Sequence, residues 1–201
     1  MRNDFYPEGT VRALLNTGLI TPATHDVLTG RLANQEVLTP IFFSKENFVT
    51  LTTVCKRLIP QLSAGRQVDL PGIMDRQLAS GTGNGWRYAS MPADGQAMLK
   101  GLYGIDETAT IMFGKAYRFL DSELQDEVLH AIQSGVVLGV TWQSLPARLF
   151  FEELLAILAE LYYSHPLAKE EIGEVSMADA KGWSKIGLNE LEDHEPRSIK
   201  T

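Results

Sequence analysis

The residues with the clearest chemical potential form a glycine-rich stretch, Gly81-Thr82-Gly83-Asn84-Gly85. Loops of this kind can hold phosphate groups with their backbone N–H groups. A Walker loop ends in Gly-Lys followed by Ser or Thr, however, and here Gly85 is followed by Trp86. A dinucleotide-binding fingerprint needs a preceding apolar strand and a following helix, whereas the residues before Gly81 are predicted to be helical. We therefore interpret the stretch as a flexible turn after a helix.

The histidines and carboxylates form no recognisable catalytic or metal-binding pattern. The four histidines are His25, His130, His165 and His194. None has a partner at the short spacing of a zinc motif such as His-Glu-x-x-His. His165 follows the longest apolar helix and is predicted to cap its C-terminal carbonyl groups, with a direct role at a partner's site as the alternative. Adjacent carboxylates such as Glu152 and Glu153 point in different directions on a helix, so they cannot share a substrate.

The single cysteine, Cys55, excludes an intrachain disulfide and lies on the apolar stripe of a predicted helix. A nucleophilic thiolate needs an accessible, electropositive environment, so a buried, inert thiol is predicted instead. The serines lack the Gly-x-Ser-x-Gly elbow of hydrolases. The sequence thus predicts no catalytic, cofactor-binding or metal-binding residue in this chain.

Composition narrows the class of protein further. The chain has 201 residues, of which 44% are hydrophobic and 21% charged, with a formal net charge of −7. These fractions are typical of a globular protein. A negative net charge disfavours nucleic acid and anionic membrane surfaces as partners. The longest apolar stretch, residues 149–163, contains three glutamates and is not predicted to span a membrane.

The elements that would carry these residues are predicted to be helices. One helix follows Ser44, with Phe43 and Phe48 in the positions of a hydrophobic staple, and stops before Pro60. Another begins at Ser122, where Gln125 would complete a capping box, and ends at Gly135. Weaker helices are predicted at residues 9–17, 22–33, 71–80, 92–103 and 106–120.

The strongest helix is predicted from Pro146 to Ser164. It is apolar almost all round, with Glu153 and Glu160 on one narrow wetted face, so it should be central in the core or covered by another protein. Val136–Val140 is either an extended connection or a short strand. From Pro166 onward the chain is predicted to be irregular but to carry large apolar anchors that lie on its own surface or a partner's.

Together these signals predict an all-α fold, an irregular helical bundle with long connections and an extended C-terminal tail. We expect a single helical domain over residues 1–201. Residues 1–39 are an unassigned N-terminal extension in this prediction, and residues 189–201 are a flexible tail.

Several short motifs, taken in order, carry a resemblance to a known family. The first group is Trp86-Arg87-Tyr88, Met91-Pro92-Ala93-Asp94 and Gly101-Leu102, and the second is Phe150-Phe151, Tyr162-Tyr163-Ser164-His165-Pro166 and Gly182-Trp183. In this order and spacing, roughly residues 43–188 resemble the gluconate 2-dehydrogenase subunit 3 family.

The resemblance implies a role as a small accessory subunit in a hetero-oligomer. Members of the family are similar in binding a large FAD-dependent sugar or polyol dehydrogenase of the glucose-methanol-choline (GMC) oxidoreductase type, which they help to fold, load with flavin or export. FAD would then belong to the partner, and haem c to a cytochrome c subunit where one is present. The chain lacks the twin-arginine signal that many members carry, so we expect a cytoplasmic location, with periplasmic co-export alongside the catalytic subunit as the alternative.

Aromatic, arginine, histidine and proline residues within these motifs are the predicted partner interface, because Trp, Tyr and Arg most often dominate protein–protein contacts. They are Trp86, Arg87, Tyr88, Tyr163, His165, Pro166 and Trp183. Two alternatives remain open. The chain could be a helical adaptor for an unrelated partner, or a small enzyme that uses Cys55 or a metal.

Overall fold

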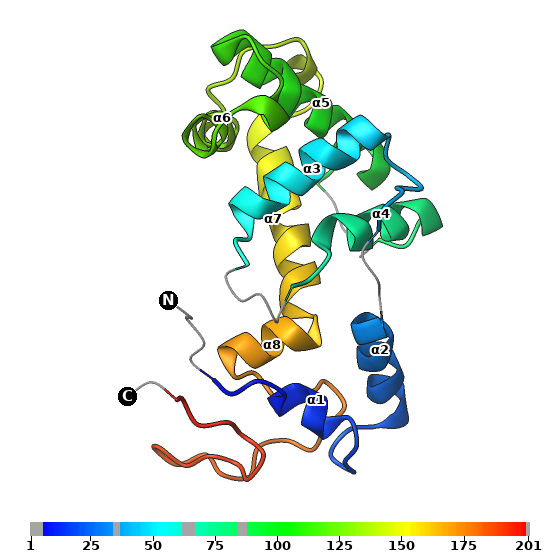
Figure 1. The fold of residues 1–201 in the computed structure, drawn as a ribbon, viewed down its shortest axis with the longest axis vertical. Coiled ribbons are helices and arrows are strands. Elements are labelled where there is room, and N and C mark those ends of the chain that lie inside the picture. The colour runs from blue at the N-terminus through cyan, green and yellow to red at the C-terminus, as the bar shows by residue number, and fades with distance from the viewer. Residues whose placement is uncertain (1–5, 34–36, 62–66, 84–87, 200–201) are drawn as a thin grey trace. The chain divides into compact units, whose positions relative to one another are not determined.

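The computed structural model describes residues 6–33, 37–61, 67–83 and 88–199. Within these ranges the chain forms helices and no strands (Figure 1). The helices are α1 (Thr10–Leu14), α2 (Pro22–Ala33), α3 (Lys45–Leu58), α4 (Leu70–Ser80), α5 (Asp94–Phe113), α6 (Ser122–Ser134), α7 (Ala147–Tyr163) and α8 (Pro166–Ile172), with 3-10 turns η1 (Tyr117–Phe119) and η2 (Thr141–Gln143). The predicted all-α class is confirmed. No helix in the described ranges is long and apolar enough to cross a membrane.

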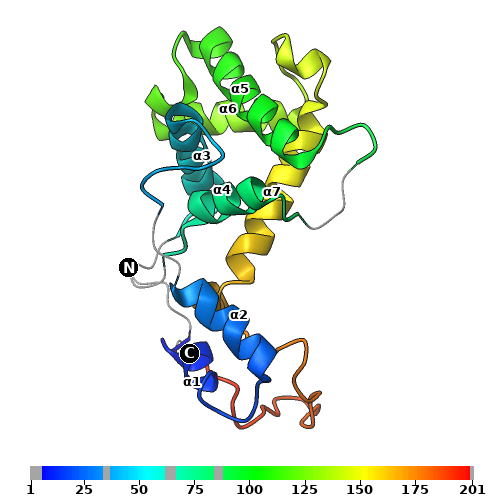
Figure 2. The ribbon, with the colours of Figure 1, turned by 90° about the vertical axis from the view of Figure 1, so that its right-hand side faces the viewer.

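The helices divide between two compact units. The central unit comprises Glu36–Pro60 and Asp69–Leu161, and the terminal unit comprises Met1–Gln35, Gln61–Val68 and Tyr162–Thr201. The central unit therefore holds α3 to α6 and most of α7, and the terminal unit holds α1, α2, α8 and the tail (Figure 2). The prediction of a single domain stays a prediction, because two compact units of one chain can belong to one domain or to two.

Several helix boundaries confirm the sequence signals. The Ser44 side chain accepts a hydrogen bond from the backbone N–H of Asn47 at 3.1 Å, and α3 ends before Pro60. The bounds of α2 are those predicted from the Thr21-Pro22 start. Gly135 adopts the left-handed conformation (φ 74°) that closes α6.

The N-terminus of α6 differs from the prediction. Asp121, not Ser122, caps the helix by accepting a hydrogen bond from the backbone N–H of Leu124 at 3.0 Å. Gln125 forms no capping box, because its buried side chain donates to the carbonyl of Leu120 at 2.8 Å. A carboxylate also suits the positive end of the helix dipole better than a neutral hydroxyl does.

The predicted break between residues 103 and 106 is absent, and α5 runs continuously through Gly104. Two glycines on this helix make room for aromatic rings of the same unit. A Cβ atom at Gly101 would lie 1.9 Å from the Phe150 ring, and one at Gly104 would lie 2.6 Å from the Trp142 ring. The Trp142 indole N–H also donates to the Thr108 hydroxyl at 2.8 Å. Packing against these rings thus compensates for the low helix propensity of glycine.

The entry to α3 is fixed by Asp75 of α4. This fully buried carboxylate accepts hydrogen bonds from the backbone N–H groups of Ile41, Phe42 and Phe43 at 2.7, 3.0 and 2.9 Å. Three charge-assisted bonds to one buried carboxylate hold this connection against α4.

In the terminal unit, the prediction of an irregular chain from Pro166 onward is wrong for the first residues, which form α8. The helix has a proline in its first turn and ends at Gly173 in the left-handed conformation. Helices α1 and α2 both pack on α8. Val11 and Leu14 of α1 form a small core with Val175, which follows α8. Residues 6–33, most of the N-terminal stretch that the sequence left unassigned, are therefore part of this unit.

Candidate partner interface

The predicted interface residues do not all lie together. Trp86 and Arg87 fall outside the described residues. Tyr88 lies in the central unit, where its half-buried phenol donates a hydrogen bond to the Glu152 carboxylate at 3.3 Å. Loss of hydration and then the charge of Glu152 raise the pKa of the Tyr88 phenol.

The other four predicted residues lie in the terminal unit. Tyr163 and Trp183 are about half exposed, at 48% and 49%, and present aromatic surface. His165 is only 5% exposed, and Pro166 is also buried. The prediction that the group contacts a partner stays a prediction, and in this conformation His165 and Pro166 offer little surface to a second chain.

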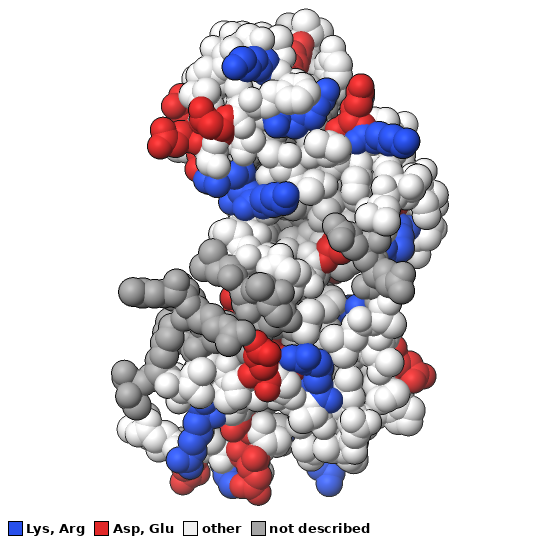
Figure 3. Space-filling view, viewed as in Figure 1, with Lys and Arg blue, Asp and Glu red and all other residues white. Residues whose placement is uncertain are grey.

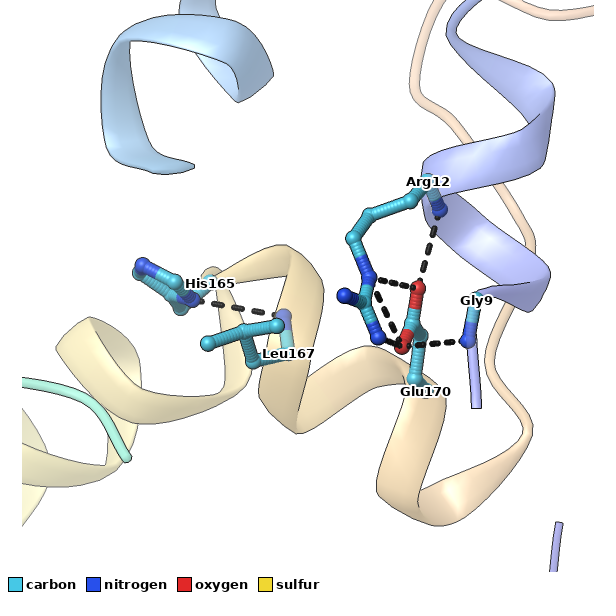
Figure 4. Close-up of polar contacts among 5 residues, drawn as sticks. All are labelled: Gly9, Arg12, His165, Leu167 and Glu170. Atoms are coloured by element: carbon cyan, nitrogen blue, oxygen red, sulfur yellow. Dashed lines mark hydrogen bonds and ion pairs between the residues drawn. The ribbon is translucent and has the colours of Figure 1, made fainter. Parts of the chain in front are cut away.

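His165 has a structural role that differs in detail from the predicted one. Its Nδ1 accepts a hydrogen bond from the backbone N–H of Leu167 at 3.3 Å, so it caps the start of α8 rather than the end of α7 (Figure 4). Its Nε2 lies 3.1 Å from the carbonyl of Arg31, in the last turn of α2. These contacts assign the neutral tautomer with the proton on Nε2, and burial lowers the pKa of the imidazole.

Glu170 of α8 is fully buried, and its carboxylate binds three groups at the start of α1. Its carboxylate accepts hydrogen bonds from the Arg12 guanidinium (2.9 Å, Nη2), the Arg12 backbone N–H (2.9 Å) and the Gly9 backbone N–H (2.8 Å), as Figure 4 shows. Burial would raise the pKa of Glu170, but the Arg12 side chain and these N–H groups hold it below its ordinary value. Sequence patterns do not reveal this role, because Glu170 is followed by Glu171 and the two resemble a pair of solvated charges.

The tail forms an ordered loop with apolar tips. The Glu192 carboxylate accepts hydrogen bonds from the backbone N–H groups of Ser184 and Lys185, the latter at 2.8 Å, and these bonds lower the Glu192 pKa to about 2. Trp183 stacks on His194, with ring centroids 6.0 Å apart. Between the two segments that these contacts join, the side chains of Ile186 and Leu188 are 86% and 94% exposed. We call residues 183–194 the tail loop.

The tail loop also forms one wall of a pocket in the terminal unit, about 740 Å³ in volume. Its apolar lining comes from Leu14, Leu19, Ile20, Val175 and Met177, and its polar lining includes Lys181, Glu192, Asp193 and His194. Glu192 is already bonded to the backbone of the tail loop, and Asp193 is paired with Lys185. The carboxylates of this pocket therefore serve the loop itself.

A second exposed apolar surface lies in the central unit. Glu107 of α5 accepts hydrogen bonds from the backbone N–H groups of Val140 and Thr141, both at 3.0 Å, and thereby fixes the connection between α6 and η2. Tyr103 and Ile111 lie one helical turn on either side of Glu107, and both are exposed, as are Leu138 and Val140. Apolar side chains gathered in this way are typical of contact surfaces.

A third feature of the central unit is a small acidic pocket of about 180 Å³. Its apolar lining includes Met74 and Leu78 of α4, Met98 of α5 and Ile157 of α7, and its two carboxylates are Asp94 and Glu160. Glu153, predicted to share the wetted face of Glu160, is instead 8% exposed. Burial first, and then the charges of Asp94 and Glu160, raise its pKa.

Two further possible sources of chemistry were Cys55 and a bound metal ion. The Cys55 thiol is buried, as predicted, and burial raises its pKa, which keeps it protonated. Among the described residues, no group of three His, Cys, Asp or Glu side chains is arranged to hold a metal ion. On the face drawn in Figure 3, acidic and basic side chains are interspersed with large uncharged areas.

The comparison with family models decides the family. The model of gluconate 2-dehydrogenase subunit 3 matches residues 45–189, well over half of the chain. The chain belongs to the gluconate 2-dehydrogenase subunit 3 family. No curated protein and no solved structure matched it in the other two comparisons. The matched range of this subunit 3 member runs from α3 into the tail loop and includes every predicted interface residue.

Proposed function

We propose that the chain is a non-catalytic small subunit that binds a large FAD-dependent GMC-type sugar or polyol dehydrogenase and supports its stability and maturation. The family match over residues 45–189 carries this proposal. In this proposal FAD and the catalytic residues belong to the large subunit, and a cytochrome c with haem c is a further component where the complex has three chains.

Two surfaces of the chain support an accessory role. The tail loop presents Ile186 and Leu188 almost fully to solvent while Glu192 holds its backbone in place. The surface around Glu107 presents Tyr103, Leu138 and Val140. Apolar groups on ordered backbone lose little conformational freedom on binding, so they suit a stable complex between two chains.

The test is a mild affinity purification of the tagged chain from its own cell, followed by mass spectrometry and an absorption spectrum. The expected result is a stoichiometric flavoprotein and the flavin bands in the eluate. The large subunit expressed alone should contain less flavin or aggregate more than the co-expressed complex. A folded, colourless chain that elutes alone would contradict the proposal.

A further inference from the structure

The pocket beside the tail loop, which we call the tail pocket, has the size of a small-molecule site. Its volume is about 740 Å³, inside the range of roughly 300–1,000 Å³ that is usual for such sites. All of its lining residues belong to the terminal unit. They come from the end of α1 with the turn after it, from the segment after α8, and from the tail loop with the residues just before it. Segments far apart in the sequence therefore border one space.

A large part of this lining is apolar. Leu14 and Val175 are buried members of the small core of the terminal unit. Ile20 and Met177 pack against that core and also line the pocket. Leu19, a further lining residue, is about half exposed. Because burial of apolar surface is the main favourable term in binding, a ligand with an apolar body suits this lining.

Trp183 adds a flat aromatic wall. Its indole stacks on the His194 imidazole, with the ring planes 11° apart and the centroids 6.0 Å apart. Trp183 nevertheless remains 49% exposed and lines the pocket. The Glu192 carboxylate accepts hydrogen bonds from the backbone N–H groups of Ser184 and Lys185, so the backbone next to the ring is fixed. A ring held in this way is a preorganised surface on which a flat ligand stacks at a low cost in conformational entropy.

The charges of the lining indicate which polar group such a ligand carries. Glu192 is bonded to backbone N–H groups, and Asp193 is paired with Lys185. Lys181, in contrast, forms no ion pair or hydrogen bond with any residue in the described part of the chain. Its side chain is exposed, and a lysine ammonium on a long flexible stem reaches an acid group at the mouth of a pocket. The uncommitted charge of the lining is therefore positive.

We propose that the tail pocket binds a small organic acid with a flat apolar body, which stacks on Trp183 and contacts Met177 while its carboxylate pairs with Lys181. This inference goes beyond the proposed function and does not depend on it, because every group that it uses lies in the terminal unit of this chain. The apolar contacts supply most of the affinity, and the exposed ion pair supplies a preference for an acid.

The first experiment titrates 2-naphthoate, and separately its uncharged analogue 2-naphthamide, into the isotope-labelled full chain. The indole N–H signal of Trp183 is followed by NMR. Saturable shifts with both probes are expected, with 2-naphthoate bound about fivefold more tightly at low salt, the ratio that one exposed ion pair supplies. Absence of a saturable shift with 2-naphthoate, or equal affinity for the two probes, would overturn the inference.

The Lys181→Gln variant tests the ion pair. Its affinity for 2-naphthoate is expected to fall by about fivefold, to that for 2-naphthamide, while its affinity for 2-naphthamide stays that of the wild type. Lys115→Gln, which removes an exposed lysine of the central unit, is the matched control and should change neither affinity. Unchanged discrimination between the probes in Lys181→Gln would overturn the role of Lys181, as would an equal loss of both.

Two further variants test the walls of the pocket, with the amide signals of Val175 and Met177 as the readout. Trp183→Leu keeps an apolar side chain but removes the stacking surface, so both probes should bind up to about tenfold more weakly. Glu192→Ala releases the tail loop and should abolish binding of both probes, while the amide signals of the central unit show that the chain is still folded. Affinity equal to that of the wild type in either variant would place the probes elsewhere on the chain and overturn the inference.

Discussion

The carboxylate of Glu170 accepts hydrogen bonds from both the guanidinium and the backbone N–H of Arg12, which lies 158 positions earlier in the chain. Arg12 precedes the range that the family model matches, whereas Glu170 lies inside it. The bond therefore attaches α1 to the family region and makes the N-terminal stretch a structural part of the terminal unit.

Glu170→Gln should lower the free energy of unfolding of the terminal unit, because it leaves the Arg12 charge without its counter-charge. We expect a loss of about 2–3 kcal/mol, less than the full cost of breaking a buried ion pair, since the Arg12 side chain is 40% exposed. Hydrogen exchange of the Gly9 and Arg12 amides measures it directly. Glu123→Gln is the control, and equal protection in the two variants would contradict the role of Glu170.

Gly101→Ala should destabilise the central unit, whereas the same substitution at Gly30 should not. A Cβ at Gly101 would lie 1.9 Å from the Phe150 ring, but one at Gly30 in α2 would meet no atom within 4 Å. We expect a loss of about 2 kcal/mol or more from overpacking at Gly101. At Gly30 we expect a gain of about 0.5–1 kcal/mol from the higher helix propensity of alanine. Urea unfolding of both variants tests the pair, and a similar effect at the two sites would contradict the close packing of α5.

Stability should depend on pH through His165. Burial lowers its pKa in the folded chain, so the unfolded chain, with an imidazole pKa near its ordinary value of 6.5, takes up a proton first as the pH falls. Stability contributed by neutral His165 is therefore present above about pH 6.5 and is lost as the pH falls below it, until the folded-state pKa is reached.

The check is the free energy of unfolding between pH 7.5 and 5, measured for the wild type and for His165→Asn. Asparagine can still cap α8 but does not titrate, so the variant should be less stable at pH 7.5 and should lose less stability on acidification. The slope difference should approach about 1.4 kcal/mol per pH unit at most. Parallel curves would show that His165 does not carry the pH dependence.

Replacing Ile186 and Leu188 together by serine should weaken the complex without destabilising the free chain. Both side chains are almost fully exposed, so their removal costs the folded chain little. Leu38→Ser/Ile41→Ser, at two exposed positions of the central unit, is the control. Isothermal titration with the large subunit should show a loss of about tenfold or more for the tail-loop variant. Unchanged affinity would remove the tail loop from the interface.

Local signals along the chain accounted for several elements. The Ser44 cap and Pro60 bounded α3, the Thr21-Pro22 pair began α2, and Gly135 ended α6, because each of these residues acts on backbone groups within one helical turn. The same local rules failed at Gly104, where a ring from a distant residue, Trp142, compensates for a glycine inside a helix.

By itself, the sequence determined the all-helical class, the resemblance to the subunit 3 family and the burial of Cys55, since periodicity and motif order are properties of the chain alone. Only the tertiary structure decided which carboxylates are buried. Glu153 and Glu170 look like solvated charges in the sequence, yet one is nearly enclosed beside Asp94 and the other is bonded to Arg12. Burial depends on which distant segments pack together, and two glutamates with the same local character can therefore have opposite electrostatic environments.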